Sequence, residues 1–322
     1  MPLPFHPKQV GLLLIDGFAL MSYAAIVEPF RAANVLAGQA LYSWRHFSVS
    51  GPMVAASNGV RITTDAVMDP QAAPEPLPDI VFVFAAGNPA AFDDRPTLRW
   101  LRRLSTLGVQ LGGVSGGPYV LARAGLLDGY RCTIHWEHRP AFVEAFPDLR
   151  VEQGLYVIDR DRLTCAGGTA GLDLALALIA ADHGPALATQ VGDWYIRSTL
   201  RDGEDAQRLA LRERYAVGNE RVLTALALME SHVADPLERS ALAAAAGVSL
   251  RQLERLFASH LGRRIGDQYL RIRLERALAL LRETSLAVTE VAMATGFVSP
   301  SHFSRSFARR YGLPPGRMRQ RG

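Results

Sequence analysis

One pattern occurs twice in the last third of the chain and restricts the fold more than any other sequence feature. In each copy a short helical stretch leads to a glycine, then to a serine that can cap a second helix, and then to an outward-facing arginine. A short helix, a glycine turn and a capped second helix are typical of a helix-turn-helix unit, whose second helix enters the major groove of DNA. The matched positions, 49 or 50 residues apart, are Gly247 with Gly296, Ser249 with Ser299 and Arg255 with Arg305.

The apolar residues of both copies follow a helical spacing. In the first copy, residues 239–246 predict the short helix, and Gln252 completes a capping box with Ser249. Residues 266–284, between the copies, predict one long helix that spaces the two units along one face of DNA. The buried stripes of the two capped helices are expected to be Leu250, Leu253, Leu256 and Phe257 in the first copy, and Phe303 and Phe307 in the second.

The outward-facing residues of the capped helices are the candidate DNA contacts. Arginine is the usual partner of guanine, through two hydrogen bonds, so we expect Arg251, Arg255 and Arg305 to contact bases. Arg309 is expected beside a phosphate group. The full set of predicted DNA-binding residues is Arg251, Glu254, Arg255, Pro300, Ser301, Ser304, Arg305 and Arg309.

Charge is divided unevenly along the chain. Residues 219–322 contain 16 arginines, no lysine and 9 acidic residues, hence a net charge of +7. The preceding part contains 19 basic and 22 acidic residues, hence a net charge of −3. A basic terminal part favours a polyanionic partner, which agrees with double-stranded DNA.

The first half of the chain alternates buried strands with amphipathic helices. Apolar runs with few polar interruptions are typical of strands covered on both faces, and their alternation with helices predicts a parallel sheet with helices on both faces. The expected fold class is a flavodoxin-like α/β domain followed by an all-α domain with two helix-turn-helix units. We expect strands at 9–16, 43–51, 79–88 and 109–114, a hairpin at 155–168, and helices at 19–38, 95–108, 118–127 and 169–184.

The stretch "GVSGG", residues 113–117, has the G-x-S-x-G pattern at the end of a predicted buried strand. Such a turn can expose a nucleophilic serine, or it can bind an anion through backbone amides at the start of the next helix. A nucleophile would need a base, for which His135 is the candidate, and a carboxylate to orient it, which the sequence does not place. We expect a binding site, with a hydrolase or amidase as the alternative. The predicted effector-binding residues are Ser115, Gly116, Gly117, His135 and Trp136; ligands also collect at the other strand ends, 16–18, 87–88 and 165–169.

Two long segments resemble known families. Residues 222–319, through "GFVSPSHFSRSFARRYGLPPGRMR", resemble the DNA-binding domain of the AraC/XylS transcription regulators. Residues 9–184 resemble the PfpI or type 1 glutamine amidotransferase-like domain, and residues 121–184 are similar to the GlxA-type regulators, which join these two domains. Enzymes of the PfpI-like superfamily carry a cysteine where this chain has Ser115, so the resemblance implies a regulator and not an enzyme. Within the group, the chain is similar to regulators of arginine, glycine betaine and carnitine catabolism.

The resemblance implies a sequence-specific DNA-binding transcription regulator. We expect an activator of a catabolic operon that is controlled by a small metabolite, an amino acid or a betaine-like carboxylate. A cationic group of this effector would face an aromatic side chain such as Trp136. The implied partners are promoter DNA, the effector and RNA polymerase, and a homodimer is also considered.

The expected domains are an effector-sensing domain at residues 1–185, a linker at 186–218 and a DNA-binding domain at 219–322. The two cysteines, Cys132 and Cys165, are too few for a disulfide framework and are expected to be packing residues in a reducing compartment. The sequence has no pattern of a signal peptide, a membrane span or a metal site. We therefore expect a cytoplasmic protein without metal, cofactor or membrane partner.

Overall fold

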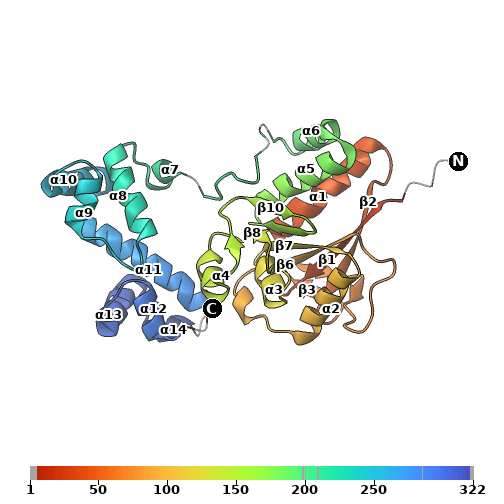
Figure 1. The fold of residues 1–322 in the computed structure, drawn as a ribbon, viewed down its shortest axis with the longest axis horizontal. Helices are drawn as coiled ribbons and strands as arrows, with labels where there is room; N and C mark the ends of the chain where they lie inside the picture. The colour runs from red at the N-terminus through yellow and green to blue at the C-terminus, as the bar shows by residue number, and fades with distance from the viewer. Residues whose placement is uncertain (1–5, 198, 200, 209, 285, 320–322) are drawn as a thin grey trace. The chain divides into compact units, whose positions relative to one another are not determined.

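The computed structural model describes residues 6–197, 199, 201–208, 210–284 and 286–319, which fold into two compact units (Figure 1). The first unit is Met1–Gln207 and the second is Arg208–Gly322. Among the described residues, no helix combines the length and apolarity needed to cross a lipid bilayer.

A seven-stranded sheet forms the centre of the first unit. Its strand order is β10-β11-β7-β6-β1-β2-β5, and all neighbours run parallel except β10 and β11, which form an antiparallel hairpin. The predicted α/β class is therefore confirmed. The sheet strands are β1 Lys8–Leu14, β2 Tyr42–Ser48, β5 Ala66–Val67, β6 Ile80–Ala85, β7 Gln110–Ser115, β10 Tyr156–Asp159 and β11 Arg162–Cys165; two short pairs are β3 Met53–Ala55 with β4 Arg61–Thr63, and β8 Arg131–Cys132 with β9 Arg150–Val151.

Helices cover both faces of this sheet, because successive side chains of its central strands point to opposite faces. Leu12 and Leu14 belong to one hydrophobic core, with α1, α5 and α6, whereas Leu13 belongs to the other, with α2 and α3 (Figure 1). The helices of this unit are α1 Leu20–Ala37, α2 Arg95–Thr106, α3 Gly117–Arg123, α4 Arg139–Ala145, α5 Ala170–His183 and α6 Pro185–Trp194, with a short 3₁₀ helix at Pro89–Ala91.

Part of the expected linker at 186–218 belongs to the first unit. α6 buries Ala188 and Val191 in the core that it shares with α1 and α5. The two units divide between Gln207 and Arg208, inside the expected linker. The difference arises because α6 carries apolar residues that become buried, whereas the sequence pattern of a short helix does not show which surface it covers.

The segment after α6, residues 195–207, is called the strap here, and two sets of hydrogen bonds hold its described residues to the first unit. Arg197 and Arg201 each donate to the buried Asp173 carboxylate at 2.6 Å. At the other end, the Gln207 side-chain amide donates to the backbone oxygen of Ile134 at 3.0 Å. Breaking the ion pairs of a buried carboxylate is costly, since it leaves the buried charge without a partner. These contacts attach Arg197, Arg201 and Gln207 of the strap to the first unit.

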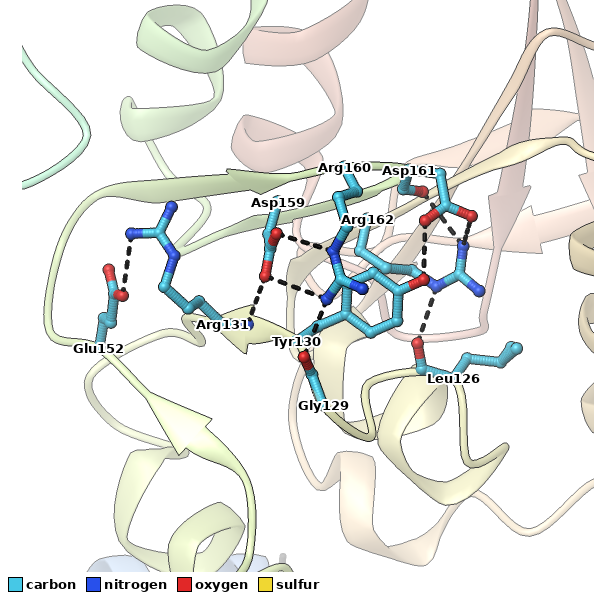
Figure 2. A network of polar contacts seen from close by, with 9 residues as sticks. All are labelled: Leu126, Gly129, Tyr130, Arg131, Glu152, Asp159, Arg160, Asp161 and Arg162. Carbon is cyan, nitrogen blue, oxygen red and sulfur yellow. Dashed lines mark hydrogen bonds and ion pairs between the residues drawn. The ribbon is translucent and has the colours of Figure 1, made fainter.

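Polar contacts fix the turn of the β10–β11 hairpin against the segment that enters β8 (Figure 2). Asp159 accepts from the backbone amide of Arg131 at 2.8 Å and from Arg160 Nε at 3.1 Å. The Arg160 guanidinium lies 3.8 Å from the centre of the Tyr130 ring. The buried Arg162 donates to a backbone oxygen of the same segment at 2.7 Å. This network positions β8, and with it the segment that continues toward the end of β7.

The second unit is helical throughout its described residues, as predicted. It has two hydrophobic cores, one around Phe257 and the other around Phe303 and Phe307. α11 contributes to both cores, with Ile265, Tyr269 and Ile272 in the first and Leu274, Ala277, Leu280 and Leu281 in the second. The helices are α7 Leu211–Tyr215, α8 Glu220–Ser231, α9 Arg239–Ala245, α10 Leu250–Leu261, α11 Ile265–Glu283, α12 Val288–Ala294, α13 Pro300–Tyr311 and α14 Pro315–Arg319.

Serine caps begin the two helices that were expected to face DNA. Ser249 accepts from the Gln252 amide and Gln252 accepts from the Ser249 amide at 3.0 Å, which confirms the predicted capping box. Ser299 accepts from the His302 amide at 3.3 Å at the start of α13. Each cap supplies an acceptor to an amide that has none within its own helix, so α10 and α13 begin at defined residues.

The turn between α12 and α13 is packed directly against the segment between α8 and α9, whose Val233 belongs to the hydrophobic core of the first helix-turn-helix unit. Gly296 has φ of +74°, and a Cβ atom there would lie 2.5 Å from Pro236 Cγ and 2.7 Å from Val233 O. Arg273, from α11, donates to Thr295 O in the same turn at 2.7 Å. The turn of the second helix-turn-helix unit is therefore held by α11 and by the segment between α8 and α9.

We expect Gly296→Ala to destabilise the second unit by about 3 kcal/mol, because it combines a left-handed alanine with steric overlap against Pro236. Gly247→Ala is the matched control, since Gly247 has φ of +66° but nothing within 4 Å of a Cβ atom. The control should cost only about 1–2 kcal/mol. Urea unfolding of residues 208–322 measures both, and equal losses would contradict the packing role of Gly296.

Candidate functional site

β7 ends in a sharp turn at Ser115, which we call the elbow. Ser115 has φ of +61°, a left-handed conformation that few non-glycine residues adopt, and α3 begins two residues later. This is the strand-to-helix turn predicted from the GVSGG stretch. Ser115 is 6% exposed, and its hydroxyl group has no hydrogen-bond partner among the described residues and is not fully enclosed. The hydroxyl is therefore available to a bound molecule.

The turn after β11 lies directly against the elbow. A Cβ atom on Gly167 would lie 2.7 Å from both Ser115 Cβ and Ser22 Oγ, so only glycine fits there. Ser22, which is 2% exposed, accepts from the Gly168 amide at 2.8 Å. The sequence predicts this turn as a strand end at which ligands collect, but it does not indicate that Ser22 lies there. A serine in the first turn of an amphipathic helix has no pattern that identifies the neighbour it faces.

The backbone amides of the two elbow glycines are not both available to a bound anion, as we expected them to be. We expected the amides of both Gly116 and Gly117 to face a bound group. The Gly116 amide instead donates to Ala85 O at 2.8 Å. Gly117 is the first residue of α3, so its amide has no acceptor within that helix. A Cβ atom on Gly117 would lie 2.1 Å from Val83 O, so this glycine is also required by the packing of α3 against β6.

An unpaired acceptor lies at the end of the neighbouring strand. Asn88 follows β6, and its side-chain oxygen is buried without a hydrogen-bond partner among the described residues. Pro89, the next residue, would lie 3.0 Å from a Cβ atom on Gly116, so this segment borders the elbow. Leaving a buried acceptor unpaired costs about 1–3 kcal/mol, which a ligand with an N–H donor would recover. We add Asn88 to the candidate ligand contacts.

His135 is joined to the elbow through the backbone. Its amide donates to Ser115 O at 3.3 Å. Burial, together with the charge of nearby His138, lowers the pKa of His135 from 6.5 to about 4. The Trp136 ring lies 5.3 Å from the His135 ring and is 43% exposed. The structure thus brings three of the predicted effector residues, Ser115, His135 and Trp136, to one region.

This geometry does not suit a nucleophilic serine. No described hydrogen bond joins the His135 ring to the Ser115 hydroxyl. The Glu137 amide donates to His135 Nδ1 at 3.3 Å, so the neutral ring carries its proton on Nε2. A ring whose free nitrogen already carries a proton cannot accept one from the serine. The elbow therefore has the backbone turn that could expose a nucleophile, but His135 cannot act as the base for its serine.

Among the described residues, neither the cysteines nor the potential metal ligands form a further reactive or metal-binding site. Cys132 and Cys165 are both buried, and burial raises the pKa of each thiol to about 12. Thiols of this kind are not nucleophilic at neutral pH. Within the ranges that the structure describes, no group of three His, Cys, Asp or Glu side chains is arranged to hold a metal ion.

In α10 the predicted DNA contacts separate into two kinds. Arg251 and Arg255 are exposed, and neither has an ion-pair partner among the described residues. Glu254 instead accepts from the Ile265 amide at the start of α11 and from Arg239, both at 3.4 Å. The sequence placed Glu254 on the outer face, but its carboxylate contacts the next helix. Its position therefore indicates a structural role rather than contact with a base.

In α13 the predicted contacts lie on one outer surface. Ser301, Arg305 and Arg309 are exposed, Ser304 is half-buried, and Pro300 is the first helical residue. The next arginine in the sequence, Arg310, pairs with Glu275 of α11 at 2.7 Å. Arg305 and Arg309 have no such partner among the described residues. Their guanidinium groups are therefore available to a polyanion.

The lowered pKa of His135 predicts a pH dependence of stability. A buried neutral histidine stabilises the fold above its unfolded pKa of 6.5, and this contribution is lost as the pH falls toward 4, because the unfolded chain binds the proton first. The loss at pH 4 should be about 3 kcal/mol. His135→Gln should flatten the dependence between pH 6.5 and 4 in urea unfolding, because it removes the imidazole that binds the proton in this range. An unchanged pH profile in His135→Gln would contradict this.

Comparisons with known proteins find relatives for both units of the chain. The DJ-1/PfpI family model matches residues 8–181 and a helix-turn-helix domain model matches residues 242–321. The HTH-type transcriptional regulator CdhR of Pseudomonas aeruginosa is 43% identical over 96% of this chain and 90% of its own. The regulator GlxA of Rhizobium meliloti is 43% identical over 98% of this chain and 96% of its own.

A solved structure supports the same assignment for the first unit. An AraC family transcriptional regulator from Pseudomonas putida matches with a TM-score of 0.53 and 28% identity, covering 59% of this chain and all of that one. The predicted regulator is confirmed, and the alternative of a hydrolase or amidase is not. The chain belongs to the family of HTH-type transcriptional regulators in which a DJ-1/PfpI domain precedes an AraC-type DNA-binding domain.

Proposed function

We propose that this DNA-binding regulator activates a catabolic operon when a small zwitterionic metabolite binds at the elbow. The observation that carries the proposal is two polar groups without a hydrogen-bond partner among the described residues, the Ser115 hydroxyl and the buried Asn88 side-chain oxygen. The hydroxyl can donate to a carboxylate and the amide oxygen can accept from an ammonium group. An amino acid presents both groups, whereas a betaine presents the carboxylate and would place its cation against Trp136.

DNA recognition is proposed to use the exposed arginines of α10 and α13. Arg251, Arg255 and Arg305 would donate paired hydrogen bonds to guanine in the major groove. Arg309 would contact a phosphate group. α11 has 19 residues, hence a length of about 28 Å, which is near the distance of about 34 Å between successive major grooves on one face. Both helices would then contact one operator.

The strap is proposed to couple the two sites. Arg201 donates to Thr169 Oγ1 at 3.0 Å, one residue beyond the glycine turn that contacts Ser115. Gln207 donates to Ile134 O, one residue before His135. A ligand that moves either flank of the elbow would therefore change how the strap is held. An effector shifts the equilibrium only by its preference for one arrangement, on the scale of about 1–3 kcal/mol. RNA polymerase and a second copy of the chain are the further partners of this proposal.

Ser115→Ala should weaken binding of the effector about tenfold, because it removes a hydrogen bond to a charged group. The probe is the amino acid or quaternary amine that most raises the melting temperature of the wild type, and calorimetry gives its affinity. DNA affinity without effector should be unchanged. Ser57→Ala, in an exposed loop, is the matched control. Unchanged effector affinity in Ser115→Ala would place the pocket elsewhere.

Arg255→Ala and Arg305→Ala should each relax base preference at a different position of the operator. Each lost pair of hydrogen bonds is expected to cost about 1–3 kcal/mol. Arg309→Ala is the comparison, since loss of a phosphate contact should weaken all sequences alike and lower the salt slope by about one. Selection from a random DNA pool, followed by gel-shift titration, measures these effects. A change at the same base pair in both mutants, or at none, would contradict the proposal.

A further inference from the structure

The two helix-turn-helix units differ by one residue in the turn. In the first unit, Val248 alone separates the turn glycine from the capping serine, whereas Phe297 and Val298 separate them in the second. The amide of Val248 donates to Ala243 O at 3.1 Å, and that of Phe297 donates to Ala292 O at 2.9 Å. These equivalent bonds identify Val248 with Phe297. Val298 is therefore the additional residue of the second turn.

The additional residue has no packing role within the unit. Phe297 fills the core position, since it is 2% exposed and its ring lies 5.1 Å from that of Phe303. The Arg273 guanidinium lies over the Phe297 ring, 4.1 Å from its centre. Val298 follows this buried residue and is fully exposed, with a relative accessibility of 102%. Its side chain contributes nothing to the hydrophobic core, so the folded unit does not explain why an apolar residue is present.

Val298 lies just before the N-terminal end of α13, the end that would enter the major groove. It directly precedes the cap Ser299, and N-terminal residues of a recognition helix are those that contact base edges. No acidic residue follows Glu290 in the chain, so α13 itself carries hydroxyl and arginine side chains but no carboxylate. The 5-methyl group of thymine is the apolar feature that the major groove offers to such a side chain.

We propose that Val298 contacts the 5-methyl group of a thymine, which makes it a specificity determinant of the second helix-turn-helix unit. The inference rests on the proposed placement of α13 in the major groove. It adds a contact that no hydrogen-bonding residue supplies, because the methyl group distinguishes thymine from the other bases by shape and apolarity. Leu250, the first residue of α10, was expected in the buried stripe but is 37% exposed, so the first helix-turn-helix unit also has an apolar side chain near the start of its recognition helix.

The test uses the full chain and an operator duplex selected from a random DNA pool. Each thymine is replaced in turn by deoxyuridine, which lacks only the 5-methyl group. The wild type should lose about fourfold in affinity at one thymine, the change expected for one buried methyl group. Val298→Ala should bind the thymine and deoxyuridine duplexes equally at that position. Val298→Thr, which keeps one methyl group, should retain part of the discrimination.

Val35→Ala is the matched control, because Val35 is an exposed valine of α1 in the first unit and should leave the thymine preference unchanged. Equal melting temperatures would show that Val298→Ala folds normally. If Val298→Ala kept the full deoxyuridine effect, or the wild type showed none, the inference would be overturned. A loss of transcription without a loss of DNA affinity would also overturn it, since it would indicate a protein contact. Arg305→Ala is measured on the same duplexes. It should lose affinity if α13 binds DNA as proposed, so an unchanged affinity in Arg305→Ala would indicate failure of the proposed DNA-binding surface rather than of the Val298 contact alone.

Discussion

The packing of one helix-turn-helix unit on the other is the constraint on which DNA recognition by this protein depends. α11 is shared by both hydrophobic cores, so neither core can form fully without it. Gly296 allows the turn between α12 and α13 to contact Val233 and Pro236, which lie between α8 and α9, and Arg273 holds that turn from α11. Two recognition helices that are fixed in this way form one surface, whose spacing is a property of the fold and not of a flexible linker.

The first unit has the sharp strand-to-helix turn that can expose a nucleophile. The strained backbone at Ser115 places a hydroxyl group at the end of a buried strand, which is the position a nucleophile would occupy. His135 is neutral, and its Nδ1 accepts from a neighbouring amide, so the serine lacks a base. What remains is a group of polar atoms beside the strap. In the proposed function, a ligand at this turn changes how the strap, which leads to the DNA-binding unit, is held.

Much of this account follows from local sequence rules, and the exceptions have a common cause. Serine caps, turn glycines and the elbow depend on a few neighbouring residues, so Ser249, Ser299 and the GVSGG stretch could be identified from the sequence. The pairing of Glu254 with the start of α11, the occupied amide of Gly116 and the approach of Ser22 to the elbow depend on segments far apart in the chain. Such contacts become visible only when the fold brings these segments together.

Lengthening the operator measures whether the two recognition helices act as one rigid surface. Base pairs are inserted between the two segments contacted by α10 and α13, and the affinity of the full chain is measured for each duplex. The account predicts that an insertion of about 5 base pairs and one of about 10, a full helical turn, both reduce affinity to that of a single contacted segment. Full affinity for the longer insertion alone would contradict the account, because it would show that the two units move independently.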